Sequence, residues 1–261
     1  MSGRVAKKVA VVTGATGGIG EGIARMLAAE GATVVVSGRR ADEGSRVAEE
    51  IRQSGGQAIY TRTDVASEAD CTGLIQSALD EYGQLDILVN NAAIFPDIPL
   101  AEITEDHWDQ VFDINVRGAF YCTRAAISPM RRQGGGSIIN IGSTLAYRSS
   151  ANRLAYACSK GALLTMTKVF ARELLSDRIR VNWVTVGWVM TPGEVELRDE
   201  IHGPGAGLAW LEERARQAPM GRLETVEDNA AGVLFLASDE SSHVTGCELN
   251  ISGGLWICEA V

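Results

Sequence analysis

Short runs of apolar residues alternate along the chain with longer stretches in which apolar residues recur every three or four positions. The short runs have the length of buried strands, and the longer stretches have the spacing of helices with one apolar face. Such alternation predicts an α/β fold in which helices connect parallel strands and cover both faces of the sheet. The predicted strands are 9–13, 33–37, 58–62, 85–90, 137–141, 180–186 and 248–251.

The same pattern predicts helices over 18–30, 42–54, 67–82, 104–130, 152–175 and 225–237. The third of these begins with Ser67-Glu68-Ala69-Asp70, which is a capping signal for a helix N-terminus. The fourth is long, and we expect it to bend. No internal repeat, low-complexity tract or linker divides the chain. We therefore expect a single domain over residues 1–261, built on one doubly wound parallel sheet of about seven strands.

Residues 191–217 depart from this regularity. They hold several glycines and a proline among charged residues and a few large apolar ones. We expect an irregular loop here. A loop of this length inside a compact domain is more often functional than idle, so residues 191–217 are the candidate lid over a substrate site.

Composition excludes several classes of protein. Hydrophobic residues make up 46% of the 261 positions, which excludes a disordered chain, and the formal net charge of -9 argues against a nucleic-acid partner. No apolar run is long enough to span a bilayer, and residues 1–8 lack the apolar core of a signal peptide. The five scattered cysteines and three histidines form no spaced ligand set, so we expect reduced thiols, a cytoplasmic location and no metal.

A glycine-rich turn follows the first predicted strand. Its glycines are spaced Gly14-x-x-x-Gly18-x-Gly20, and a predicted helix comes directly after them. Glycines let the backbone approach a phosphate closely, and the N-terminus of the helix presents free N–H groups and partial positive charge to an anion. No Gly-Lys-Ser/Thr follows, so the turn is not a P-loop. The turn therefore predicts a nucleotide site.

A second group of residues predicts proton transfer. Tyr156 and Lys160 are four residues apart on a predicted helix, thirteen residues after Ser143 at the end of an apolar run. Side chains at positions i and i+4 share one face of a helix. A nearby ammonium favours phenolate, so we expect Lys160 to lower the pKa of Tyr156 and make it a usable base near neutral pH.

Taken together, these motifs resemble the short-chain dehydrogenase/reductase family over almost the whole chain, from Lys8 to Gly254. Residues 13–20 match its Thr-Gly-x-x-x-Gly-x-Gly turn, Asp64-Val65 its adenine-side pair, and residues 90–93 its Asn-Asn-Ala-Gly element with Ala93 in place of glycine. The resemblance implies a Rossmann-like fold, an NAD(P)-dependent oxidoreductase acting on a secondary alcohol or its carbonyl, and a homotetramer. The implied catalytic residues are Asn115, Ser143, Tyr156 and Lys160.

In this family Lys160 would also contact the cofactor ribose, Asn115 would hold a water that links Lys160 to solvent, and Ser143 would orient the substrate oxygen. The cofactor-binding residues that the motifs and the resemblance indicate are Gly14, Thr16, Gly17, Gly18, Ile19, Gly20, Arg39, Arg40, Asp64, Val65, Asn91, Ala92, Ala93, Tyr156, Lys160, Val189 and Thr191.

The end of the second predicted strand bears on the choice of cofactor. A carboxylate there would bind the ribose 2′-hydroxyl of NAD and repel the 2′-phosphate of NADP. This chain has Gly38 at that position, followed by Arg39 and Arg40. Arginine can form charge-assisted, bidentate bonds to a phosphate. The sequence thus favours NADP, with NAD as the alternative.

The substrate is less well defined. The candidate substrate residues are Ser143, Leu145, Arg148, Arg153 and Trp188. The two arginines suit an anionic or polyhydroxylated substrate such as a sugar or sugar acid, and solvated arginines are the ordinary alternative. A 3-oxoacyl-thioester reductase is the second candidate function. A catalytically silent dinucleotide-binding regulator and a sugar epimerase are alternatives of other classes, which the four catalytic residues and the chain length disfavour respectively.

Overall fold

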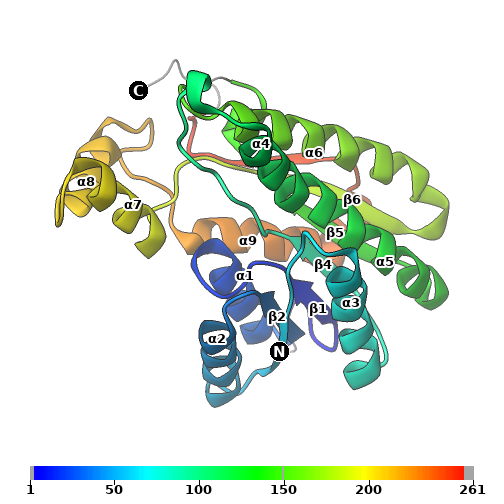
Figure 1. The fold of residues 1–261 in the computed structure, drawn as a ribbon. Helices are drawn as coiled ribbons and strands as arrows, with labels where there is room; N and C mark the ends of the chain where they lie inside the picture. Colours follow the sequence, from blue (N-terminus) through cyan, green and yellow to red (C-terminus); the bar gives the residue numbers. More distant parts are fainter. Residues whose placement is uncertain (1–2, 149, 256–261) are drawn as a thin grey trace.

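A seven-stranded parallel sheet forms the centre of the computed structural model, which describes residues 3–148 and 150–255 (Figure 1). The strand order is β3-β2-β1-β4-β5-β6-β7, and each pair of neighbours is parallel. The strands are β1 (Val9–Val12), β2 (Thr33–Gly38), β3 (Gln57–Arg62), β4 (Ile87–Asn90), β5 (Gly136–Ile141), β6 (Ile179–Val186) and β7 (Glu248–Ile251). This confirms the predicted fold class.

The order of the strands reverses direction beside β1. The chain runs outward from β1 through β2 to β3, then returns to place β4 on the other side of β1. In an open sheet of this kind, ligands bind at the carboxyl ends of the strands where the direction reverses. The candidate site is therefore expected beyond Val12 and Asn90, where β1 and β4 end.

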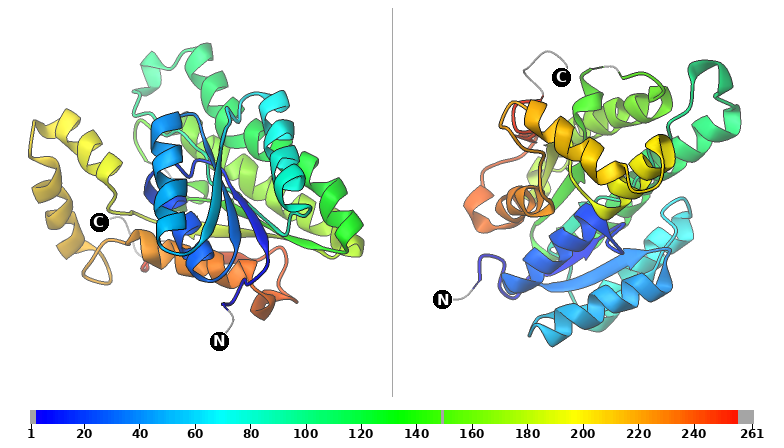
Figure 2. Two further views of the ribbon diagram at one scale, coloured as in Figure 1. Left: turned by 90° about the horizontal axis from the view of Figure 1, so that it is seen from below. Right: turned by 90° about the vertical axis from the view of Figure 1, so that its left-hand side faces the viewer.

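Helices cover both faces of the sheet, and each face has its own apolar core (Figure 2). On one face α1, α2 and α9 pack on side chains such as Val12, Val34 and Val184. On the other face α3, α5 and α6 pack on side chains such as Val11 and Leu88. Alternate residues of one strand point to opposite faces, which is why neighbours such as Val11 and Val12 belong to different cores. The helices are α1 (Gly18–Ala29), α2 (Ala41–Gln53), α3 (Glu68–Tyr82), α4 (Glu105–Phe112), α5 (Gly118–Gln133), α6 (Leu154–Glu173), α7 (Pro192–His202), α8 (Gly207–Gln217) and α9 (Val226–Ala237).

The long helix predicted over 104–130 contains a π-helical segment between two α-helical ones. Thr104 caps α4 by accepting the His107 N–H, and α4 passes without a break into a π-helical segment, Asp113–Arg117, and then into α5. A π segment widens a helix by one residue and is frequent at functional sites. Asn115, one of the predicted catalytic residues, lies in this π segment.

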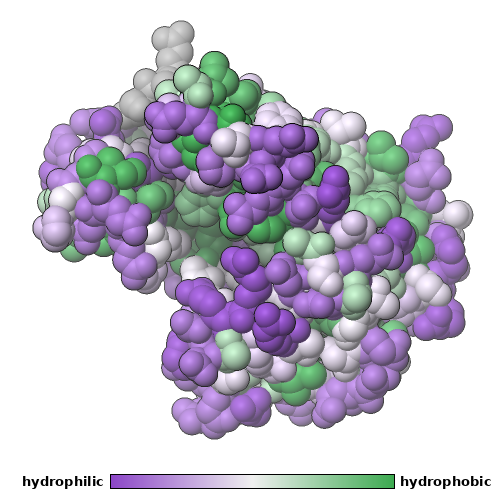
Figure 3. All heavy atoms as spheres, in the orientation of Figure 1, coloured by the Kyte–Doolittle hydropathy of each residue, from purple (hydrophilic) through white to green (hydrophobic). Residues whose placement is uncertain are grey.

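The expectation of a loop over 191–217 is wrong. The segment forms two helices, α7 and α8, joined by a turn in which Gly203 and Gly205 have φ of 108° and 76°. Thr191 caps α7 through the Glu194 N–H, and Pro192 occupies the first helical turn, where no intrahelical bond is lost. The glycines therefore mark the turn of a helical hairpin that projects from the body of the molecule (Figure 1). Figure 3 shows a hollow between this hairpin and the body.

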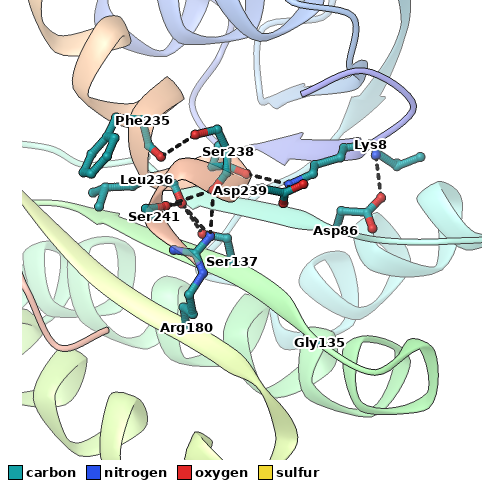
Figure 4. Close-up of polar contacts among 12 residues, drawn as sticks. Lys8, Asp86, Gly135, Ser137, Arg180, Phe235, Leu236, Ser238, Asp239 and Ser241 are labelled. Atoms are coloured by element: carbon teal, nitrogen blue, oxygen red, sulfur yellow. Dashed lines mark hydrogen bonds and ion pairs between the residues drawn. The ribbon is translucent and has the colours of Figure 1, made fainter. Parts of the chain in front are cut away.

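The C-terminal end of α9 is fixed by two cations, one on β6 and one directly before β1 (Figure 4). Arg180 on β6 donates to the carbonyls of Leu236 and Ser238, and Lys8 donates to the carbonyl of Ala237. The last carbonyls of a helix have no intrahelical partner and carry partial negative charge, so cations stabilise them. These contacts hold α9 against the sheet. In the described part of the chain, no helix is long and apolar enough to cross a membrane.

Candidate active site

A cleft of about 450 Å³ lies at the carboxyl ends of the strands, as the reversal in strand order predicts. It extends from the glycine turn to the first turns of α6, and Thr191, the residue before α7, borders it. The predicted site residues that line it are Gly14, Thr16, Gly17, Gly18, Ile19, Gly20, Arg39, Arg40, Asp64, Val65, Asn91, Ala92, Ala93, Ser143, Tyr156, Lys160 and Thr191. Segments far apart in the sequence thus meet in one cavity.

The glycine turn is held against the loop that follows β4. Thr13 Oγ1 accepts the N–H groups of Asn91 and Ala92 at 3.0 and 3.1 Å, and Asn91 Nδ2 donates to the carbonyls of Thr13 and Gly14. Gly14 has a φ of 64°, and a Cβ there would lie 2.8 Å from Ala92 Cα. A Cβ at Gly20 would overlap Asn91 Nδ2. The turn needs glycine at both positions, and its open backbone at the start of α1 fits the phosphates of a dinucleotide.

Two arginines border the cleft beyond the end of β2. The Arg40 guanidinium donates to Thr16 Oγ1 and to the Thr16 carbonyl at 3.1 to 3.2 Å, which anchors it beside Gly17. Among the residues that the structure describes, neither Arg39 nor Arg40 forms an ion pair with a carboxylate. Two cations without carboxylate partners can therefore meet an anionic group in this part of the cleft.

Ser143 and Tyr156 lie together at the inner end of the cleft. Ser143 follows β5 and precedes a short 3-10 turn, Thr144–Ala146, and its Oγ accepts the Leu145 N–H at 3.1 Å. Burial raises the pKa of the Tyr156 phenol, and its hydrogen bond with Ser143 and the charge of Arg153 act in the opposite direction. The phenol is thus protonated at neutral pH, which is the form that donates a proton.

Lys160 is buried one helical turn after Tyr156. Its Nζ donates to the Ile141 carbonyl at 2.8 Å and lies 5.7 Å from the centroid of the Tyr156 ring. Burial lowers the pKa of Lys160 to about 8. The expectation that Lys160 lowers the pKa of Tyr156 does not hold in this structure, because desolvation outweighs every attraction and Ser143 and Arg153 supply the opposing effects. The two side chains share a helix face as predicted.

Asn115 lies behind the cleft rather than in its lining. Its Oδ1 accepts the Ile94 N–H at 2.8 Å, and its Nδ2 donates to the Ile94 carbonyl at 2.9 Å and to Ser159 Oγ at 3.0 Å. Ser159 Oγ in turn donates to the Tyr156 carbonyl. Asn115 therefore connects the loop after β4 to the first turns of α6, which carry Tyr156 and Lys160.

Besides Asn115, five of the predicted residues take positions outside the cleft lining. The Arg153 guanidinium pairs with Asp97 at 3.1 Å and donates to the Phe95 carbonyl, and Arg148 donates to the Leu255 carbonyl at 2.9 Å. Because both arginines are held by this chain's own groups, their placement gives no support to an anionic substrate. The other three are Leu145, whose N–H donates to Ser143 Oγ, Val189, which is buried, and Trp188, whose indole N–H donates to Glu194.

Sequence reasoning missed the apolar wall beside Tyr156. Ile94 and Phe95 line the cleft, and the Phe95 ring meets the Tyr156 ring edge to face at 5.9 Å. Both follow the Asn-Asn-Ala-Ala element, so a reading that extended past Ala93 could have found them. Gly187, directly after β6, was also missed. Among the described residues, no group of three or more His, Cys, Asp or Glu side chains could hold a metal ion.

The sequence is similar to those of several known proteins. The sequence model of the family described as enoyl-(acyl carrier protein) reductase matches residues 14–256. Cyclopentanol dehydrogenase of Comamonas sp. (strain NCIMB 9872) is 39% identical over 252 residues, covering 97% of this chain and 98% of that protein. The 3-oxoacyl-(acyl-carrier-protein) reductase of Thermotoga maritima is 34% identical, covering 97% of this chain and 100% of that protein.

Among solved structures, a candidate NAD(P)-dependent gluconate 5-dehydrogenase from Beutenbergia cavernae, with NADP bound at low occupancy, superposes with a TM-score of 0.87 at 34% identity. The alignment covers 98% of each chain. This chain belongs to the short-chain dehydrogenase/reductase family and is an oxidoreductase of that family. The resemblance read from the motifs is confirmed.

Proposed function

We propose that this chain interconverts a secondary alcohol and its carbonyl compound, with Tyr156 as the group that transfers the proton. The observation that carries the proposal is the meeting of Ser143, Tyr156 and Lys160 in the cleft that also contains the glycine turn. A nicotinamide dinucleotide, when bound, accepts the hydride from the alcohol carbon or returns it. A silent regulator would need none of the three side chains in this arrangement.

Each of these side chains has a distinct role in the proposal. Ser143 Oγ, whose position is fixed by the Leu145 N–H, orients the substrate oxygen by a hydrogen bond. Tyr156 donates its proton to the carbonyl oxygen during reduction and removes the hydroxyl proton during oxidation. Lys160 loses or gains a proton near pH 8, so it can pass protons between Tyr156 and solvent. Asn115 holds the backbone that carries both residues.

We propose NADP as the preferred cofactor. The glycine turn, Asp64 with Val65, and residues 91–93 would hold the dinucleotide, and the segment through Val189 and Thr191 would contact its nicotinamide end. Arg39 and Arg40 support the preference, because both border the cleft and neither pairs with a carboxylate of the described residues. The low-occupancy NADP in the related structure is consistent with it.

Reversing one of these charges should change the cofactor preference. Arg39→Asp is expected to lower the ratio of kcat/KM with NADP to kcat/KM with NAD by about 10- to 100-fold, because a charge-assisted bond to phosphate is replaced by repulsion. Arg40→Asp should act in the same direction and also release Thr16. Steady-state rates with both cofactors measure the ratio, and Arg172→Asp on α6 is the control for a change of charge alone. An unchanged ratio in both cleft variants would refute the assignment to NADP.

For the substrate, we propose a small uncharged alcohol or ketone. The wall beside Tyr156 is formed by Ile94 and Phe95, and the nearby Arg153 is neutralised by Asp97. These features suit an apolar ring or short chain better than a sugar acid. The similarity to cyclopentanol dehydrogenase supports the same class. The similarity to a 3-oxoacyl reductase keeps a thioester as the second candidate.

A panel of substrates separates these possibilities. Cyclopentanol, gluconate and a 3-oxoacyl thioester would each be supplied with the oxidised or reduced form of each cofactor, and nicotinamide absorbance would be followed. We expect the highest kcat/KM with cyclopentanol or a related cyclic alcohol. A higher kcat/KM with gluconate would restore the anionic substrate, and no turnover with any compound would contradict the proposed activity. The homotetramer and the cytoplasmic location remain predictions.

A further inference from the structure

Glu224 is a buried carboxylate that the proposed mechanism does not use. It lies just before α9, with 6% of its surface exposed, and no ion pair involves it in residues 3–148 and 150–255. A buried carboxylate without a cation is costly, so it is expected to have hydrogen-bonding partners that justify its position. Those partners lie in the segment that follows β6 and on α9.

Hydrogen bonds of both its side chain and its backbone join Glu224 to its surroundings. Its Oε1 accepts the Trp188 N–H at 3.0 Å, and its Oε2 accepts from Asn229 Nδ2 at 3.1 Å. Its backbone N–H donates to the Trp188 carbonyl, and its backbone carbonyl accepts the Met190 N–H, both at 3.0 Å. Residue 224 therefore holds the backbone of Trp188 and Met190 from one side.

The residues on either side of this contact belong to the cleft. Gly187 and Thr191 both line it, one just before and one just after the residues that Glu224 holds. A Cβ at Gly187 would overlap Glu224 Oε1, so the carboxylate packs directly against the backbone there. Trp188 is also fixed at its other end, where its indole N–H donates to Glu194 on α7 at 2.9 Å. A shift of the Glu224 side chain would displace both cleft residues and the attachment of α7.

We propose that Glu224 is a positioning residue that holds the segment 187–191 in the arrangement presented to the cleft. This inference rests on the proposed function, because the segment borders the reacting centre only if the cleft is the active site. Glu224 itself does not line the cleft, so it contacts neither the substrate nor the dinucleotide in this proposal. It acts through the backbone of Trp188 and Met190.

The charge on Glu224 gives a signature that a purely structural residue would lack. Burial raises the pKa of Glu224 to about 7, against the hydrogen bonds from Asn229 and from the Gly187 and Trp188 N–H groups. Two other charged groups face it. Asp228 on α9 raises the pKa further, and Arg222 is paired with Asp228. Protonation near neutral pH weakens an acceptor of the Trp188 N–H, so the surroundings of Trp188 should change in that range.

The test compares three variants. Glu224→Ala should lower kcat/KM for the best alcohol of the panel by about 10- to 100-fold, because small displacements at a reacting centre are costly. Glu224→Gln keeps an oxygen for the Trp188 N–H and should remain within about threefold of the wild type. Its new N–H₂ can donate to Asn229 Oδ1, a buried acceptor without a hydrogen-bond partner among the described residues, if the Asn229 amide rotates and gives up its bond to the Thr225 carbonyl. Glu227→Ala, at an exposed position three residues further on, is the matched control.

A second readout does not depend on turnover. Tryptophan fluorescence of the wild type should show a transition near pH 7 that Glu224→Gln removes and Glu227→Ala keeps. His202 stacks on Trp210, so the titrations are made in a His202→Gln background. The proposal is overturned if the transition persists in Glu224→Gln, or if Glu224→Ala turns over as fast as Glu227→Ala. If no alcohol is turned over by the wild type, the proposed function fails, and the fluorescence titration alone decides whether Glu224 holds the segment.

Discussion

Replacing Tyr156 by phenylalanine should reduce turnover of the best alcohol by about 100- to 10,000-fold, which is the range that a positioned proton-transfer group contributes. The change removes one oxygen and leaves the ring, so the edge-to-face contact with Phe95 is retained. Dinucleotide affinity should stay within a few-fold of the wild type, since the glycine turn and the end of β2 are untouched. Steady-state kinetics and an equilibrium titration measure the two effects separately.

Tyr82→Phe is the matched control for this variant. Tyr82 is the last residue of α3, and its half-buried side chain packs against the core on that face of the sheet and does not line the cleft. Burial also raises the pKa of the Tyr82 phenol, so this variant tests the loss of a partly buried phenol hydroxyl without the loss of a catalytic one. If Tyr156→Phe retained more than about a tenth of wild-type turnover, Tyr156 would not be the group that transfers the proton.

Replacing Lys160 by methionine should change activity and stability in opposite directions. Turnover is expected to fall by about 100-fold or more, because the group that exchanges protons near Tyr156 is lost. The free energy of unfolding at pH 7 should rise. Burial lowers the pKa of Lys160 from 10.5 to about 8, which corresponds to roughly 3 kcal/mol of destabilisation in the charged form. The lost bond to the Ile141 carbonyl offsets about 1 kcal/mol of the gain.

The dependence on pH follows from the same shift. Between about pH 8 and 10.5 the unfolded chain carries the Lys160 proton and the folded chain has lost it, so this group makes the folded state more stable as pH rises through that window. Below pH 8 the full cost of the buried charge is present. The advantage of Lys160→Met should therefore be largest near neutral pH and shrink toward pH 10.5. Thermal unfolding of both proteins across this range, without dinucleotide, is the measurement, and a lower Tm for the variant at pH 7 would contradict it.

A further comparison asks whether Lys160 acts through Tyr156. If it does, adding Lys160→Met to Tyr156→Phe should cost little additional turnover, because residues that act as a unit are strongly non-additive. Independent contributions would multiply instead. The double variant therefore distinguishes a shared proton path from two separate roles.

The sheet and the main helices were predictable because their signals are local. Apolar runs such as Val9–Val12 and the glycine turn before α1 determine where strands end and helices begin. The strand bounds differ from the prediction by at most two residues, and those of β7 agree with it. The loop predicted over 191–217 is wrong because the glycines of this segment signal a break, whereas Thr191 and Pro192 form a capping signal for a helix. That signal is also local, and it could have shown that α7 begins there.

Contacts between distant segments could not be predicted from the sequence. Nothing near Arg153 in the chain shows that Asp97 will neutralise it, and nothing near Glu224 shows that it will meet Trp188. The burial of Lys160 also depends on packing between distant segments. Spacing along a helix places it beside Tyr156, whereas only packing shows that desolvation dominates the pKa of both groups. The spacing along the helix thus predicted that Tyr156 and Lys160 lie together, and their burial determines the direction of their pKa shifts.

The central claim is that the cleft binds a nicotinamide dinucleotide beside a proton-transfer site. An equilibrium titration of the purified chain with NADP and with NAD tests it most directly. We expect saturable binding of one dinucleotide per chain, tighter for NADP, in both the wild type and Tyr156→Phe. No measurable affinity of the wild type for either dinucleotide would contradict it.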